Sequence, residues 1–346
     1  MKKFIPVLFL IPFLCLSVTA TTFEAPEVPD SGKNWMPYEA ESFADGIISI
    51  FRDAIDVYQP ALAASAGKLL RVVGIVILLS CVKCLPGTPE HITQVVGVAA
   101  VSVLFMGSSG TMIRLAADTV GQLSEYAKLL FPVLTAAFAA QGGITSSAAL
   151  YTGTMAFVAL LGGLATAVIV PLAYIFLCLC ILSAATEQAM VAKIKDLIKW
   201  LITWALKLTL YIFTAYMSIT GVVSGSTDAA ALKATKIAIS GIVPVVGGIL
   251  SDTSEAVLVG ARVMKNTVGI YGMYAILAVW IGPFLEIGIQ YLLLKAGYGI
   301  CSVFSVKKVT GLLKDFSGAM GLLLALTGTL CLMLMIGIVC FMKGVN

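Results

Sequence analysis

The stretch Phe131–Ser147 reads FPVLTAAFAAQGGITSS, and Val243–Ala256 repeats its order of residue types as VPVVGGILSDTSEA. Each stretch has a proline near its start, then apolar residues, a Gly-Gly pair and Ser or Thr. Each stretch is followed by an apolar run that contains one proline. This proline comes 39 residues after the proline of the stretch in both cases (Pro132 to Pro171, 171 − 132; Pro244 to Pro283, 283 − 244). Paired apolar segments interrupted by Gly and Pro are typical of re-entrant hairpins at a binding or conduction site in membrane proteins.

The composition of the chain indicates that it is a membrane protein. Hydrophobic residues make up 60% of its 346 residues and charged residues 12%, whereas soluble domains have about 45–50% and about 25%. Several apolar runs reach the roughly 20 residues that a helix needs to cross a bilayer. The sequence therefore predicts an all-α, polytopic helical membrane protein and excludes a soluble globular domain.

The N-terminus has the features of a secretory signal peptide. Lys2-Lys3 precede the apolar run Phe4–Leu16, and Val18-Thr19-Ala20 supply a small-residue cleavage site. Residues 1–20 are therefore expected to be removed. The alternative is an uncleaved first helix, but the apolar run is short for a full span.

The next segment, residues 21–66, is predicted to form an extracytoplasmic lead that ends in an amphipathic helix. Apolar residues recur at helical spacing in Phe43–Tyr58, with charged residues between them. Such a helix lies at the membrane interface or packs on the bundle.

Charge bias gives the expected topology. Five apolar runs are clear candidate spans: Leu69–Leu85, Ile92–Ile113, Lys199–Val222, Val268–Ala296 and Ser317–Phe341. The basic connections around Lys193–Lys199 and Lys307–Lys314 are expected in the cytoplasm by the positive-inside rule. The mixed-charge stretches Arg114–Lys128 and Thr227–Lys265 are then expected outside.

This topology requires an odd number of crossings between Lys128 and Lys193. We therefore predict a re-entrant hairpin that enters through Pro132 and returns after Gly142-Gly143, followed by one true span that contains Pro171. Non-helical backbone at membrane depth must be buried in protein or line a wet cavity, so the hairpin is expected to face the bundle centre or an oligomer interface. With its counterpart at Pro244, the count is six spans and two hairpins.

The two halves of the chain also suggest an internal repeat. An offset of 112 relates Pro132 to Pro244 (244 − 132) and Lys195 to Lys307 (307 − 195). The predicted organisation is a pair of spans in residues 67–113, repeat unit one in 114–224 and repeat unit two in 225–346. The alternative is a chance recurrence of Pro and Gly in a chain with 32 glycines.

The candidate pathway residues cluster at the two predicted hairpins. Glycine permits the positive φ that a tight turn needs, and hydroxyl or carboxylate side chains after it line a polar mouth or cap the next helix. Both roles are left open for Ser251 and Asp252, and for their counterpart Thr145-Ser146-Ser147. The hairpin candidates are Pro132, Gly142, Gly143, Pro244, Gly247, Gly248, Ser251 and Asp252.

Glu286 is a candidate because it lies within a predicted span, three residues after Pro283 and one turn before Gln290. A charge at the centre of a span costs about 2.5–3.5 kcal/mol, so it normally faces a partner or water. A functional or inter-subunit role and a neutral, hydrogen-bonded carboxyl are both consistent with this position. Lys207 lies two turns into its span, where a lysine snorkels to the interface.

The chain shows no signature of an enzyme. Its one histidine, His91, lies in a short polar loop, and neither a P-loop nor a GxSxG or H-E-x-x-H motif occurs. We expect no catalytic residue, cofactor or metal. The basic residues are dispersed among the connections, so no nucleic-acid partner is expected.

The stretch Ile242–Asp252, with its PVVGG-x-x-SD motif, resembles the signature of the stage III sporulation protein AE family, as does Val263–Gly269. The resemblance covers most of the mature chain. It implies a multi-pass protein of the mother-cell-derived membrane around the forespore. It also implies a channel or transport complex with a secretion-type ATPase, ring-forming proteins and a forespore-anchored partner.

Two other functions remain open at this stage. One is an autonomous secondary transporter of a small solute, with the hairpins as binding site and Glu286 as coupling carboxylate. The other is a structural membrane scaffold without transport. Besides membrane lipid, a second copy of the chain is a candidate partner.

Overall fold

A computed structural model describes residues 25–37, 42–83, 89–186, 188–242, 247–304 and 306–343. For residues 221–242, 247–262 and 264 it describes the backbone alone. The predicted signal peptide 1–20 and Pro244 lie outside the described residues.

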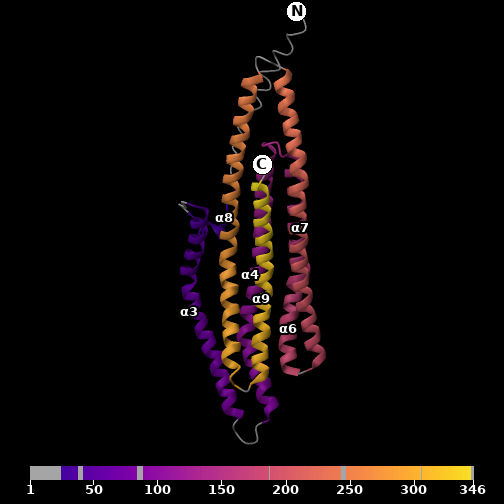
Figure 1. Cartoon of the computed structure of the whole chain (residues 1–346). Coiled ribbons are helices and arrows are strands. Elements are labelled where there is room, and N and C mark those ends of the chain that lie inside the picture. Colours follow the sequence, from indigo (N-terminus) through magenta and orange to yellow (C-terminus); the bar gives the residue numbers. More distant parts are fainter. Residues whose placement is uncertain are drawn as a thin grey trace, which may run out of the picture.

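The described part of the chain is a bundle of long antiparallel helices and contains no strand (Figure 1). In order, the elements are α2 (Asp30–Lys33), α3 (Phe43–Lys83), α4 (Glu90–Ala139), α5 (Ile144–Leu164), the π-helical turn η1 (Ala165–Ile169), α6 (Val170–Thr186), α7 (Ala189–Ile242), α8 (Gly247–Cys301) and α9 (Lys307–Lys343).

Six helical stretches in the described residues are long and apolar enough to cross a membrane: Phe43–Lys83, Glu90–Ala139, Ile144–Thr186, Ala189–Thr220, Lys265–Cys301 and Lys307–Lys343. The predicted fold class and the predicted six spans are confirmed. The protein is a multi-pass membrane protein.

The core of the bundle lies where α9 packs between α4 and α8. Helix α9 also contacts α5, α6 and α7, whereas α3 lies at the edge against α8 and α4. Aromatic rings fill the centre of one end of this core: the Phe341 ring centroid lies 5.6 Å from that of Phe131 and 6.2 Å from that of Phe138. Burial of α4, α8 and α9 against one another therefore fixes the frame on which the other helices lie.

The helices are longer than a bilayer requires. Helix α4 has 50 residues and α8 has 55, which at 1.5 Å per residue is roughly 75–80 Å, against about 30 Å of hydrocarbon. The stretch Arg114–Lys128, predicted as an external connection, is part of α4. Its charged residues are exposed while the residues between them, such as Ala116 and Leu123, are fully buried. Charge on one face does not interrupt a helix whose other face packs on the core.

The prolines differ in their effect on the helices. Pro60, Pro132 and Pro283 lie inside α3, α4 and α8 without ending them. Pro171 is the second residue of α6, which follows the π-helical turn η1. Because proline has no N–H to continue the hydrogen-bond ladder, a local change to wider helical bonding is an expected accommodation.

The structure does not show the two predicted re-entrant hairpins or the internal repeat. The first Gly-Gly pair lies in the turn between the long helices α4 and α5. The second lies at the start of α8, where α7 and α8 continue beyond the other helices (Figure 1). Helices α3, α4 and α7 each extend across one of the predicted segment limits, at residues 66/67, 113/114 and 224/225. The helices continue past the charged residues from which these limits were predicted.

Candidate functional site at the contact of α3 and α8

Helices α3 and α8 lie side by side in a fixed parallel register. A Cβ placed on Gly46 would lie 2.5 Å from the Tyr274 hydroxyl, and one placed on Gly297 would lie 3.3 Å from Leu69. Both pairs are 228 residues apart (274 − 46 and 297 − 69). The glycines allow the close approach of the two helices at both ends of the contact.

Glu286 lies at the middle of this contact. The Glu286 side chain is half-buried, on the side of α8 that meets α3. A Cβ on Gly282, one turn earlier, would lie 3.4 Å from the Tyr58 hydroxyl and 3.8 Å from Nε1 of Trp35. No ion pair joins Glu286 to any described residue. The site therefore presents a carboxylate beside a phenol, inside a helix that is otherwise apolar at this level.

Polar groups continue from Glu286 toward α4. Gln290, one turn further along α8 and buried, donates a hydrogen bond from Nε2 to Oγ of Ser108 at 3.3 Å. On the same part of α4 the hydroxyls of Ser102 and Ser109 are buried and have no hydrogen-bond partner among the described residues. Buried hydroxyls are normally hydrogen-bonded, so this part of the interface is polar but incompletely satisfied.

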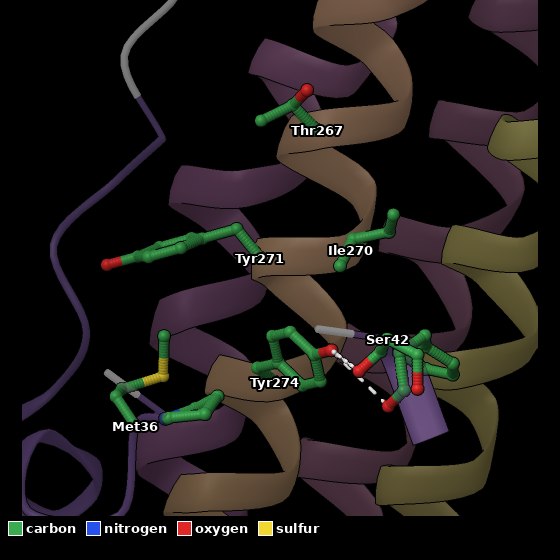
Figure 2. Close-up of a pocket in the computed structure, with 8 residues that line it drawn as sticks. Met36, Ser42, Thr267, Ile270, Tyr271 and Tyr274 are labelled. Atoms are coloured by element: carbon green, nitrogen blue, oxygen red, sulfur yellow. Dashed lines mark hydrogen bonds between the residues drawn. The ribbon is translucent and has the colours of Figure 1, made fainter. Parts of the chain in front are cut away.

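A cavity of about 470 Å³ opens at the end of the contact near the start of α3. Its α8 wall is formed by Thr267, Ile270, Tyr271 and Tyr274. The Tyr274 hydroxyl donates to the carbonyl oxygens of Phe43, at 3.3 Å, and Ser42, at 3.5 Å. Figure 2 shows the Tyr271 ring extending away from the α8 ribbon on the same side as Met36.

A second cavity, of about 240 Å³, lies on the other side of Glu286 between the same two helices. Its lining is almost entirely apolar: Leu62, Ser65, Ala66, Leu69, Ile289, Leu292, Leu293 and Ala296. Neither cavity is lined by Glu286: on α8 the first ends at Tyr274 and the second begins at Ile289. The α3–α8 contact therefore has polar groups and surface cavities along its length.

The first Gly-Gly pair ends α4 in a Schellman motif. Gly142 has φ 90°, its N–H donates to the Ala139 carbonyl, and the Gly143 N–H donates to the Phe138 carbonyl. This is the bond pattern of a glycine C-cap. A Cβ on Gly143 would lie 2.4 Å from the Phe138 ring, so both glycines are needed for the turn. The predicted need for positive φ is confirmed at Gly142.

Lys265 of α8 packs against this turn. Its Nζ lies 4.8 Å from the centre of the Phe138 ring, and the residue is 2% exposed. A desolvated cation on an aromatic face is stabilised by about 2 kcal/mol. Ser146 and Ser147 are buried at the start of α5 beside the turn, whereas Pro132 is exposed one and a half turns before Phe138.

The other predicted residues do not join the α3–α8 contact. Gly247, Gly248, Ser251 and Asp252 are in the first turns of α8, where only the backbone is described. Lys265 lies beside the Gly142-Gly143 turn between α4 and α5. The α8 residues that precede Lys265 therefore extend past this turn. Pro283 is half-buried on α8 next to Gly282, and Lys207 is exposed on α7.

Sequence patterns did not indicate the aromatic part of the site. Trp35 and Tyr58 stack at a centroid distance of 6.4 Å, but they belong to different segments and neither lies in a recognisable motif. Only the packing of α3 and of the segment after α2 on α8 brings them to Gly282, one turn from Glu286. The spacing of Glu286 and Gln290 by one helical turn was the available signal for the polar side of the site.

Comparison with known proteins gives one family. The profile described as "Stage III sporulation protein AE" matches residues 47–344. A protein of that name from Bacillus subtilis (strain 168) is 26% identical over 185 residues, which are 54% of this chain and 46% of that protein. The aligned part thus spans about half the length of the relative. No solved structure matches.

Proposed function

Because this chain belongs to the stage III sporulation protein AE family, we propose that it is the multi-pass membrane component of a sporulation channel or transport complex. The complex links mother cell and forespore and is required for late forespore development. Its other parts are an ATPase, ring-forming proteins and a forespore-anchored partner. The protein is placed in the mother-cell-derived membrane around the forespore, and its role there is not enzymatic.

The observation that carries the proposal is the family match over nearly all of the six-helix bundle. The α3–α8 contact supports a role in passage rather than anchoring alone. It places a half-buried carboxylate between two cavities in a membrane span, and ionisable residues within spans typically mark substrate or ion pathways.

The proposal is tested in a spore-forming host that lacks the gene. The wild-type chain is expected to restore heat-resistant spores and the activity of a late forespore reporter, and to copurify with the other complex members. Glu286→Gln is expected to assemble normally but to lower the reporter activity. Lys207→Gln, which removes an exposed charge from another span, is the matched control. Normal sporulation without the gene would refute the proposal.

A secondary transporter that works alone is the second candidate, and the position of Glu286 favours it. Purified chain in proteoliposomes would then move a solute in response to an imposed proton or sodium gradient, and Glu286→Gln would abolish that movement. Solute uptake without any partner would favour an autonomous transporter over a component of the complex. Full function of Glu286→Gln in the cell would instead favour a structural scaffold without transport.

A further inference from the structure

Helix α9 is uncovered along one face, which lies between α7 and α8 (Figure 1). Elsewhere on the helix nearly every residue is buried. A Cβ placed on Gly311 or Gly328, near the two ends of this stretch, would meet no atom within 4 Å. We call the following exposed or half-buried residues the open face of α9: Gly311, Lys314, Gly318, Gly321, Ala325 and Gly328.

Two lysines meet on the open face. Lys314 belongs to α9 itself, one turn before Gly318. A Cβ on Gly318 would lie 3.1 Å from Nζ of Lys199, which reaches across from α7. The nearby Lys195–Asp315 ion pair joins the same two helices, so two contacts fix the register of α7 on α9 at this level.

A third lysine comes from the other side, on α8. Nζ of Lys295 lies 6.0 Å from the centre of the Tyr291 ring, and a Cβ on Gly321 would lie 3.7 Å from that ring. Further along α8, a Cβ on Gly297 would lie 3.7 Å from Leu313. Lys295 lies between these two contacts, which places it level with the part of α9 between their partners. We call Lys199, Lys295 and Lys314 the lysine cluster.

The lysine cluster carries positive charge that no neighbouring carboxylate neutralises. All three residues are exposed, and none forms an ion pair with a described residue. Asp315 is already paired with Lys195, and the exposed Asp196 of α7 is not paired with any of the three. The complementary ligand is therefore an anion.

The cluster lies at an edge of the membrane core. Three apolar stretches begin or end at it, with Lys207 and Glu286 as their only charged residues: 200–220 of α7, 266–294 of α8 and 316–342 of α9. Just beyond Lys199, the exposed rings of Trp200 and Trp204 stack at a centroid distance of 6.0 Å, and tryptophan is enriched at membrane interfaces. By the positive-inside rule this edge faces the cytoplasm.

Beyond the cluster, the open face is apolar for the depth of one leaflet. From Gly318 to Gly328 it consists of glycine and alanine, so no long side chain of α9 projects from it. These residues span ten positions (328 − 318), which rise about 15 Å. That is half of the roughly 30 Å of hydrocarbon in a bilayer.

We propose that an anionic phospholipid of the cytoplasmic leaflet binds at this place, with its phosphate among the lysine cluster and one acyl chain along the open face of α9. Lysine binds phosphate as a point charge, and basic sites between membrane spans bind the headgroups of anionic lipids. An acyl chain spans one leaflet, so its length matches that of the apolar part of the face.

A lipid is the occupant because it matches both parts of the site. A free phosphate or a nucleotide would pair with the lysines but leave the apolar face uncovered. An apolar helix of a partner would cover the face but leave the three charges unpaired. The inference does not depend on the proposed channel role, because lipid binding is a property of the chain alone.

The test uses the purified full chain in a neutral detergent. Dioctanoyl phosphatidylglycerol is expected to raise the temperature of thermal unfolding in a saturable manner. Dioctanoyl phosphatidylcholine, which has the same chains and no net charge, is expected to raise it much less. Glycerol 3-phosphate, which has the charge but no chains, is expected to have no effect at the same concentration.

Variants of the lysine cluster locate the headgroup. Lys199→Gln, Lys295→Gln and Lys314→Gln are each expected to weaken phosphatidylglycerol binding about fivefold, which is the usual contribution of one lysine to the binding of anionic lipid. Lys343→Gln is the matched control, because it removes one exposed charge at the other end of α9. The control should bind the lipid as the wild type does.

A second pair of variants locates the acyl chain. Gly328→Leu fills the open face within the membrane and is expected to weaken phosphatidylglycerol binding severalfold. Gly311→Leu, on the other side of the lysine cluster, should leave binding unchanged. At both positions the new side chain begins in open space, so neither change disturbs the packing of α9.

Three results would overturn the proposal. Equal stabilisation by the two lipids would show that charge plays no part, and equal stabilisation by glycerol 3-phosphate would indicate a soluble anion. Equal weakening in Lys343→Gln and in the cluster variants would indicate a general effect of charge. Since the purified chain is tested without any partner, such a failure would leave membership of the sporulation complex untouched.

Discussion

The Nζ atom of Lys195 lies 2.5 Å from a carboxylate oxygen of Asp315, although the residues are 120 positions apart in the chain. The pair joins α7 to α9, with side chains that are 11% and 25% exposed. Lys195 is one of the basic residues from which the topology was predicted. In the structure the Lys195 ammonium is paired with the Asp315 carboxylate of a neighbouring helix and is largely shielded from water.

Asp315→Asn is expected to destabilise the bundle, because it leaves the Lys195 ammonium buried without its counter-charge. Loss of one partner of a fully buried pair costs about 3–5 kcal/mol, and the partial exposure of Asp315 lowers this value. Thermal unfolding in detergent measures the effect. Lys33→Gln, which breaks the exposed Asp30–Lys33 pair, is the control and should cost less than about 1 kcal/mol. Equal stability of the two variants would contradict a structural role of the buried pair.

Gly142→Ala is expected to destabilise the α4–α5 turn. Gly142 has φ 90°, and an L-residue in left-handed backbone costs about 1–2 kcal/mol. Gly107→Ala is the matched control in the same helix, since a Cβ there meets no atom within 4 Å. In a helix interior this control should raise stability by about 0.5–1 kcal/mol. Thermal unfolding of both variants should therefore shift in opposite directions, and a shared direction would argue against the turn geometry.

The two ends of α9 are expected on opposite sides of the membrane. Helix α9 runs from Lys307 to Lys343, and its C-terminal end lies near the end of α4, where the Phe341 ring packs on that of Phe138 (Figure 1). In a chain without other cysteines, Lys307→Cys at the exposed start of α9 should react with a membrane-impermeant thiol reagent only from the cytoplasm. Lys343→Cys should react only from the extracytoplasmic side. Labelling of both positions from one side would refute the six-span topology.

The α3–α8 contact is expected to admit water as far as Glu286. A cysteine in place of Glu286 should react with a small water-soluble thiol reagent in membranes, because the side chain is only half-buried and a cavity begins three residues further along α8, at Ile289. Ile287→Cys is the neighbouring control and should remain unreactive, since Ile287 is 0% exposed. If the two cysteines react at the same rate, the contact is not a route for water.

Local sequence patterns predicted much of the fold. Hydropathy indicated five spans, charge bias required a sixth, and the Gly142-Gly143 pair indicated a tight turn with positive φ. The apolar runs and the turn are properties of short stretches: an apolar run long enough for a membrane forms a helix in it, and glycine is the residue that permits left-handed backbone.

The extents of the helices were not predictable in the same way. Arg114–Lys128 was interpreted as a connection because four of its residues are charged. In the structure these charges lie on one exposed face of α4, while Leu123 and Tyr126 are buried in the core. Charge content alone does not show which face of a helix is covered, so the prediction ended the helix too early.

The sequence by itself determined the class of protein, the number of apolar helices and the place of the first turn, because these depend on residues close together in the chain. Only the tertiary structure decided that Tyr58 lies beside Gly282, one turn from Glu286, and that Lys195 meets Asp315. Each of these relationships depends on how far one helix has slid along another. Apolar faces allow many such positions, and the choice is made by packing contacts between distant residues, such as Gly46 with Tyr274 and Gly297 with Leu69.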